Sequence, residues 1–152
     1  MRDAEGGLRP FHLAVPVDDL GAARRFYGGV LGLKEGRSSE RWIDFDFGGH
    51  QFVVHRVERG TVEASRNPVD GDRVPVPHFG IVLRPEAFEA LVERLRDADW
   101  PIEIGPRRRF EGRAGEQWTL FLRDPAGNAL EFKAFRDDRA LFASDPDAPP
   151  YA

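Results

Sequence analysis

The chain has 152 residues, which suits one domain with a sizeable core, and it contains no cysteine, which excludes disulfides, thiolate metal ligands and a cysteine nucleophile. Its 22 basic and 26 acidic residues are well mixed and give a net charge of −4, which argues against a nucleic-acid partner. No stretch approaches the roughly 18 consecutive apolar residues of a membrane span, and residues 1–10 lack the apolar segment of a secretion signal. We therefore expect a cytoplasmic protein that acts on a small molecule and has no membrane partner.

The first part of the chain, residues 10–59, predicts a strand, a helix and a hairpin. Alternating side chains favour strands at residues 11–17, 41–47 and 51–57, with a short extra strand near residues 36–39. Asp18 and Asp19 offer N-cap carboxylates to the helix. This helix is expected to end at Gly28, Gly29 and Gly32.

The pattern restarts after a polar stretch, residues 60–76, that we expect to be a linker without elements of its own. Residues 77–83 and 100–104 predict strands, a helix follows Pro85, and residues 118–122 and 130–132 predict a closing hairpin. Residues 106–110 are expected to form a basic loop, and residues 136–152 a C-terminal arm.

The closing hairpin turns at residues 124–128, Asp-Pro-Ala-Gly-Asn. Proline fixes φ, glycine accepts positive φ, and Asp and Asn bond their own backbone, so these residues predict a tight turn. Side chains alternate across the strand that follows, which puts Leu130 and Phe132 on one face and Glu131 and Lys133 on the other. A glutamate met in isolation is usually solvated, because Glu is seldom buried unless it is paired.

The two halves can be superimposed as an internal repeat. The superposition matches His12 with His78, Trp42 with Trp118, Gly49 with Gly127 and Val53 with Glu131. Two βαβββ modules, at residues 10–59 and 77–135, predict a single α+β domain over residues 1–152. Its curved, mostly antiparallel sheet would gather alternate side chains on a concave face.

On that face, two imidazoles and one carboxylate would converge. A lone core histidine is more often a hydrogen-bonded structural residue, but the equivalent placement of His12 and His78, with Glu131 in the closing strand, predicts a metal site. Three such ligands leave positions open for water, substrate or O₂, which is typical of non-haem Fe(II) oxygenases. His55 has the parity of Val53, so it is a candidate for positioning a ligand or transferring a proton.

Three stretches carry a family resemblance: FHLAVPVDDL at residues 11–20, PHFG at residues 77–80 and DPAGNALEF at residues 124–132. Together they resemble the vicinal oxygen chelate superfamily, which contains glyoxalases, extradiol dioxygenases and bleomycin-resistance proteins. The resemblance spans residues 10–135, and Asp-Pro-x-Gly-Asn-x-x-Glu is its most specific part. The chain is most similar to small proteins described as predicted dioxygenases of the extradiol type.

The resemblance implies a homodimer with a divalent metal on His12, His78 and Glu131, Fe(II) being favoured over Zn, Mn or Ni. Val53 stands where glyoxalases carry a fourth ligand, a glutamate, so a site with three ligands fits better. In short relatives the site forms within one chain or across two chains that swap modules, and the sequence leaves this choice open.

These inferences favour an Fe(II) dioxygenase that acts on a small aromatic or anionic substrate with vicinal oxygens. His55 and Gln117 are its candidate catalytic residues. Arg109 and Gln117 are candidates for substrate binding, because arginine suits carboxylates, although a solvated basic loop is the alternative for Arg109. A non-catalytic, resistance-type protein that binds a drug and a metal-dependent lyase or isomerase of the same superfamily are the other open functions.

Overall fold

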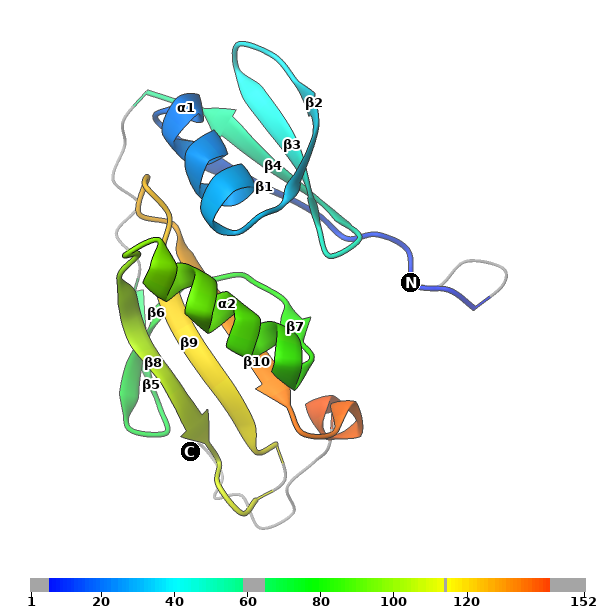
Figure 1. The fold of residues 1–152 in the computed structure, drawn as a ribbon, viewed down its shortest axis with the longest axis vertical. Helices are drawn as coiled ribbons and strands as arrows, with labels where there is room; N and C mark the ends of the chain where they lie inside the picture. The colour runs from blue at the N-terminus through cyan, green and yellow to red at the C-terminus, as the bar shows by residue number, and fades with distance from the viewer. Residues whose placement is uncertain (1–5, 59–64, 114, 143–152) are drawn as a thin grey trace. The chain divides into compact units, whose positions relative to one another are not determined.

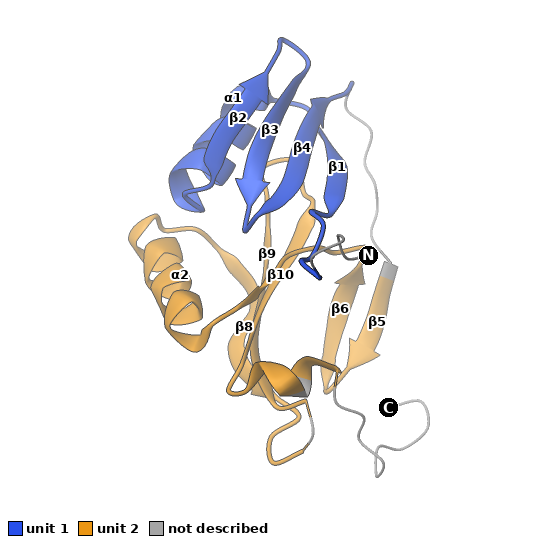
Figure 2. Cartoon of the chain, turned by 90° about the vertical axis from the view of Figure 1, so that its right-hand side faces the viewer, with its two compact units in different colours: residues 1–61 blue, residues 62–152 orange. Residues whose placement is uncertain are grey.

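The computed structural model describes residues 6–58, 65–113 and 115–142. The chain divides into two compact units, residues 1–61 and residues 62–152, which Figure 2 colours separately. Each unit contains a four-stranded sheet and a helix, and unit 2 also holds a two-stranded hairpin (Figure 1). The α+β architecture with two similar modules is therefore confirmed.

Unit 1 has the strand order β1-β4-β3-β2, in which β1 and β4 run parallel and the other neighbours antiparallel. Its elements are β1 (His12–Val17), α1 (Leu20–Ala23), η1 (Arg24–Val30), β2 (Lys34–Ser38), β3 (Trp42–Phe47) and β4 (His50–Arg56). All four strands expected in this part of the chain are present, with small shifts at their ends.

The helix of unit 1 begins as predicted and ends at the last of the three predicted glycines. The side chain of Asp19 accepts the backbone N–H of Ala22 at 3.0 Å and caps α1. The chain then continues through η1, a π-helical segment that contains Gly28 and Gly29. The prediction is wrong for these two glycines, which lie inside the helix, but it is confirmed for Gly32, which follows the C-cap Leu31 with a φ of 71°.

Aromatic rings fill the buried face of the unit 1 sheet. Tyr27 of η1 is fully buried, with its ring centroid 4.8 Å from that of Phe52 and 5.6 Å from that of Phe45. Burying a side chain of this size contributes roughly 2 to 3 kcal/mol. Because side chains alternate, His12 and Val53 lie on the opposite face, as the sequence predicts.

Unit 2 repeats this order as β7-β10-β9-β8, again with one parallel pair, β7 and β10. Its elements are β5 (Ser65–Val69), β6 (Asp72–Val76), β7 (Val82–Leu83), α2 (Pro85–Asp97), β8 (Ile102–Arg109), β9 (Gln117–Arg123), β10 (Ala129–Phe135) and the 3-10 helix η2 (Asp138–Phe142). Residues 143–152 of the expected arm lie outside the described residues. None of the described helices is long and apolar enough to cross a membrane.

The helix α2 lies along one face of the unit 2 sheet (Figure 1). It buries Phe88, Leu91 and Leu95, and the strands bury Leu130 and Phe132 of β10. These two residues are on the face that the sequence assigned to the core. Glu131 and Lys133 consequently lie on the other face of β10.

Residues 65–76, which we expected to be part of a linker, form the hairpin of β5 and β6. Asp70 and Gly71 take φ values of 45° and 84° at its tip, as a two-residue hairpin turn requires. Pro68 and Pro75 hid this signal in the sequence, but a two-stranded ribbon has free edges where proline is tolerated.

Two further expectations for unit 2 are wrong in detail. The basic stretch continues as strand β8 to Arg109 instead of forming a loop, because Arg107 to Arg109 pair with β9. The match of the two tryptophans is shifted, since Trp42 lies opposite His55 whereas Trp118 lies opposite Ala134 on the core-facing side. A shift of one residue exchanges the faces of a strand.

Candidate metal centre

The turn before β10 fixes where Glu131 falls. Asp124 is buried, and its Oδ1 accepts the backbone N–H groups of Ala126 at 2.9 Å and Asn128 at 2.8 Å. Its Oδ2 accepts the side-chain amide of Asn128 at 2.8 Å. Gly127 takes a φ of 91°, which glycine adopts without strain. The Asp-Pro-x-Gly-Asn sequence therefore anchors the start of β10 and sets the face on which Glu131 emerges.

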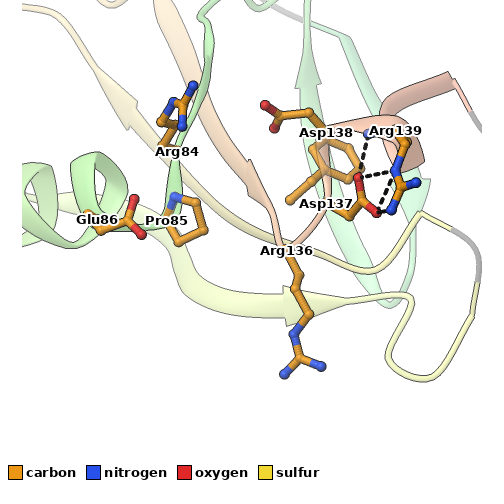
Figure 3. A pocket seen from close by; sticks show the side chains of 8 residues that line it. Arg84, Pro85, Glu86, Arg136, Asp137, Asp138 and Arg139 are labelled. Atoms are coloured by element: carbon orange, nitrogen blue, oxygen red, sulfur yellow. Dashed lines mark hydrogen bonds and ion pairs between the residues drawn. The ribbon is translucent and has the colours of Figure 1, made fainter.

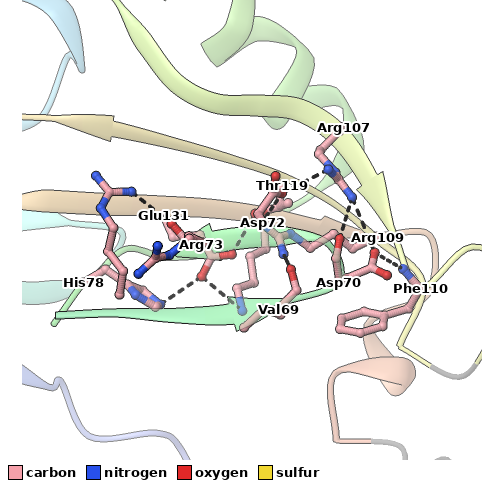
Figure 4. A network of polar contacts seen from close by, with 12 residues as sticks. Val69, Asp70, Asp72, Arg73, His78, Arg107, Arg109, Phe110, Thr119 and Glu131 are labelled. Atoms are coloured by element: carbon pink, nitrogen blue, oxygen red, sulfur yellow. Dashed lines mark hydrogen bonds and ion pairs between the residues drawn. The ribbon is translucent and has the colours of Figure 1, made fainter. Parts of the chain in front are cut away.

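Glu131 is buried among polar side chains of unit 2 (Figure 4). The hydroxyl of Thr119 donates to its Oε1 at 2.7 Å, while its Oε2 lies 3.1 Å from His78 Nε2 and 3.2 Å from Lys133 Nζ. Burial alone would raise the pKa of Glu131, but the hydrogen bonds from His78 and Thr119 and the charge of Lys133 together lower it. The carboxylate is therefore ionised at neutral pH.

The imidazole of His78 has a defined orientation. Its Nδ1 lies 2.6 Å from the carbonyl oxygen of Pro75, and a carbonyl only accepts, so Nδ1 carries a proton. The Nε2 atom then faces Glu131, and the hydrogen bond to this carboxylate raises the pKa of His78. The ring also packs edge-on against Phe121, with centroids 5.1 Å apart. This is the arrangement of a histidine that presents Nε2 to a metal.

A close backbone approach brings His78 and Glu131 together. The N–H of Glu131 donates to the carbonyl of Phe79 at 2.8 Å, and the N–H of Phe79 donates to the carbonyl of Ala129 at 3.2 Å. A Cβ atom on Gly80 would lie 1.7 Å from the carbonyl oxygen of Glu131. Only glycine therefore permits this packing, which places Gly80 among the residues that build the site.

In unit 1, His12 is exposed and oriented in the same way. Its Nδ1 lies 2.8 Å from Gln51 Oε1, and Gln51 Nε2 donates to the carboxylate of Asp44 at 3.4 Å. Because a carboxylate accepts, the amide nitrogen of Gln51 faces Asp44 and its oxygen faces His12. The Nδ1 of His12 is therefore the donor, and Nε2 is left to bind a metal.

Two of the three predicted ligands are spaced as two ligands of one divalent metal would be. Two ligands that bind a metal at right angles with bonds of about 2.1 Å lie about 3.0 Å apart, and His78 Nε2 and Glu131 Oε2 are separated by 3.1 Å. The structure thus brings two of the three predicted ligands together within unit 2, and His12 belongs to unit 1. Over residues 6–58, 65–113 and 115–142, no three His, Cys, Asp or Glu side chains form a group that could hold a metal.

The other predicted site residues lie in both units. His55 is exposed in β4, opposite Trp42. Gln117 and Arg109 are opposite each other in β9 and β8, and both are buried, with exposed fractions of 7% and 2%. The alternative of a solvated loop is therefore wrong for Arg109.

The hairpin holds most of the Arg109 guanidinium. Its Nη1 donates to the carbonyl of Val69 at 2.6 Å and its Nη2 to Asp72 at 2.9 Å (Figure 4). In the described part of the chain, Arg109 Nε and Gln117 Oε1 are buried without a hydrogen-bond partner. One donor and one acceptor are thus left for a ligand or water.

Sequence reasoning missed Thr119 and Lys133 as neighbours of Glu131. Lys133 had a signal, since it has the parity of Glu131 in the same strand. Thr119 had no such signal in the sequence. It lies near Glu131 because β9 and β10 pair Thr119 with Lys133, whereas matching the two tryptophans implied a different pairing of these strands.

Unit 2 has a pocket beside the start of α2 (Figure 3). It is lined by Arg84, Pro85, Glu86, Phe135, Arg136, Asp137, Asp138 and Arg139. Arg139 contacts Asp137 at 2.6 Å and lowers the pKa of this carboxyl to about 2. None of the predicted site residues lines this pocket, so the candidate site remains the face around Glu131.

The chain matches one family model and is similar to several known proteins and structures. The model of the Glyoxalase/Bleomycin resistance protein/Dioxygenase superfamily matches residues 9–132. A glyoxalase/bleomycin resistance protein/dioxygenase from Alicyclobacillus acidocaldarius has a similar structure, with a TM-score of 0.74 and 38% identity over 88% of this chain and 96% of that one. A lactoylglutathione lyase from Agrobacterium tumefaciens shares the fold, with a TM-score of 0.61 and 22% identity over 90% of this chain and 97% of that one. A virulence protein of Salmonella typhimurium is 27% identical over 124 residues, which are 82% of each protein.

Proposed function

We propose that this chain, which belongs to the glyoxalase/bleomycin resistance protein/dioxygenase superfamily, is an enzyme whose divalent metal binds to His12, His78 and Glu131. The observation that carries the proposal is the pair of His78 Nε2 and Glu131 Oε2, which are 3.1 Å apart. Their other polar atoms are already tied, Nδ1 to Pro75 and Oε1 to Thr119. Nε2 and Oε2 are thus held facing each other, and a metal bound between them would replace their mutual contact.

The metal would act as a Lewis acid on adjacent oxygens of a small substrate. We propose Fe(II) as the metal, a dioxygenase as the enzyme and a homodimer as the assembly. His55 lies on the same face of its sheet as His12 and is exposed, which suits a group that takes a proton from the substrate. Gln117 and Arg109 would bind the substrate through their two unpaired buried atoms, Oε1 and Nε.

A metal-dependent lyase is the second candidate, because the lactoylglutathione lyase shares the fold over nearly its whole length. The glyoxalase form of this reaction is disfavoured, because Val53 stands where glyoxalases carry a glutamate as their fourth metal ligand. A drug-binding protein without catalysis would not need the paired His78 and Glu131.

Metal content tests the proposal. Protein purified without oxygen should carry close to one divalent metal per chain when it is measured by inductively coupled plasma mass spectrometry. Glu131→Ala should lose most of this metal, because two imidazoles hold such ions too weakly to survive purification. Glu89→Ala, on the exposed side of α2, is the matched control and should keep it. Equal metal in the two variants would rule out Glu131 as a ligand.

Oxygen consumption separates the two reactions. With Fe(II) restored, a panel of catechols should give oxygen uptake and a yellow ring-cleavage product. Metal binding without oxygen uptake for any catechol would favour the lyase.

A further inference from the structure

Lys133 is placed beside the candidate metal ligand but has no role in the proposed reaction. It follows Glu131 by two residues on the same face of β10, and its Nζ lies 3.2 Å from Glu131 Oε2. Its side chain is about one-third exposed, so its ammonium is within reach of a ligand. The chain has 22 basic residues, of which only Lys34 and Lys133 are lysines. A compact ammonium, not a guanidinium, thus stands at this position.

Lys133 has a different acidic partner from Arg107 and Arg109, the cations of the neighbouring strand β8. Arg107 contacts Asp72 at 3.1 Å and Asp70 at 3.7 Å, and Arg109 contacts Asp72 at 2.9 Å, so two carboxylates of the hairpin balance these two cations. Among the residues that the structure describes, the acidic group that contacts Lys133 is Glu131. In the metal-free protein, Lys133 is therefore balanced by the carboxylate that the proposed function gives to the metal.

A metal on Glu131 changes this balance. The carboxylate would then serve a divalent cation, and Lys133 would face that cation in a half-buried place where charges are weakly screened. Asp72 already contacts Arg107 and Arg109. An anionic group of the ligand is what restores the balance.

We propose that Lys133 forms an anion subsite beside the metal and binds a carboxylate that lies next to the metal-binding oxygens of the substrate. This inference rests on the proposed function, because Lys133 is released only when a metal takes Glu131. It narrows the substrate class to small organic acids that carry vicinal oxygens. An ammonium suits this task as a point charge that reaches a carboxylate from several directions.

The test uses two probes that differ in one charge, 2,3-dihydroxybenzoate and 2,3-dihydroxybenzamide, with zinc-loaded protein to avoid turnover. Isothermal titration calorimetry should show that the wild type binds the benzoate at least about tenfold more tightly than the benzamide. Lys133→Met should bind the two probes within about threefold of each other, and Lys133→Arg should keep part of the preference. Lys34→Met, which removes the other lysine, should behave as the wild type.

Zinc binding without a probe gives a second measurement. Lys133→Met should bind zinc several-fold more tightly than the wild type, because it removes a cation that competes for Glu131. A carboxylate preference that survives in Lys133→Met, or that is missing in the wild type, overturns the inference while the metal site stands. A wild type that binds no zinc overturns the proposed function and this inference together.

Discussion

The two units share a strand order and an equivalent histidine, but they surround that histidine differently. In unit 1, the residue across from Ala14 is Val53, and in unit 2 the equivalent position is Glu131. His12 is held by the side chain of Gln51 at the surface, whereas His78 is held by a backbone carbonyl and a buried carboxylate. The same scaffold thus supplies a single imidazole from one unit and a paired imidazole and carboxylate from the other.

A second difference lies in the first strand of each unit. Ala14, two residues after His12, carries a Cβ atom that β4 accommodates, while Gly80, two residues after His78, has no room for one. The basic residues His55 and Lys133 likewise occupy equivalent places, two positions after Val53 and Glu131. Closer strand packing therefore accompanies the carboxylate in unit 2, and the variants below probe these differences.

The largest expected effect is a loss of stability when Gly80, which packs against the backbone of Glu131, is replaced. Gly80→Ala should lower the free energy of unfolding by about 3 kcal/mol, because its Cβ atom would collide with the carbonyl oxygen of Glu131. Ala14→Gly, the reciprocal change in unit 1, should cost only about 0.5 to 1 kcal/mol. Urea unfolding measures both. A Gly80→Ala protein as stable as Ala14→Gly would contradict the geometry around Glu131.

The next effect concerns how each histidine is oriented. Gln51→Ala removes the acceptor of the His12 Nδ1 proton, and loss of such a partner typically lowers metal affinity about 10- to 100-fold. Gln51→Glu keeps an acceptor and should retain most of the affinity. Competition with a chromophoric chelator measures the difference. Equal affinities for Gln51→Ala and the wild type would mean that Gln51 does not orient a metal ligand.

The sequence predicted most of the strands because alternation and turn residues are local signals. The turn at residues 124–128 is the best case, since Asp124 and Asn128 bond within the turn itself. The repeat then predicted His12, His78 and Glu131 as metal ligands, which stays a prediction, and the structure places His78 beside Glu131 and His12 on the same face of its sheet as Val53. The sequence alone therefore predicts the features that depend on short-range hydrogen bonds and on the periodicity of side chains.

The features that were missed depend on contacts between distant strands. Thr119 reaches Glu131 through the register of β9 and β10, and Arg109 is buried because a hairpin packs on it. The hairpin was itself missed, as two prolines outweighed the Asp70-Gly71 signal. Gly80 looked like any loop glycine until the neighbouring backbone was in place.

The smallest expected effect is a pH dependence that belongs to unit 2. In the metal-free protein, the contact of His78 with Glu131 raises the pKa of the histidine, and the pKa of Glu131 is lowered. A raised histidine pKa stabilises the fold below the ordinary value of 6.5, and this contribution is lost as the pH rises through the folded pKa. A lowered glutamate pKa stabilises above the ordinary value of 4.5 and is lost as the pH falls through the folded pKa. The pair therefore contributes most between these two values.

Thermal unfolding with a chelator present measures this contribution. The wild type should exceed Glu131→Gln by on the order of 1 kcal/mol between about pH 4.5 and 6.5, a modest value because His78 is partly exposed to solvent. The gap should narrow as the pH rises through the raised pKa of His78, where the imidazole loses its charge. Glu89→Gln, which changes an exposed carboxylate on α2, should follow the wild type at every pH. A difference in unfolding free energy between the wild type and Glu131→Gln that stays constant over this pH range would show that the contact of His78 with Glu131 does not depend on protonation. Unit 2 would then differ from unit 1 in packing alone.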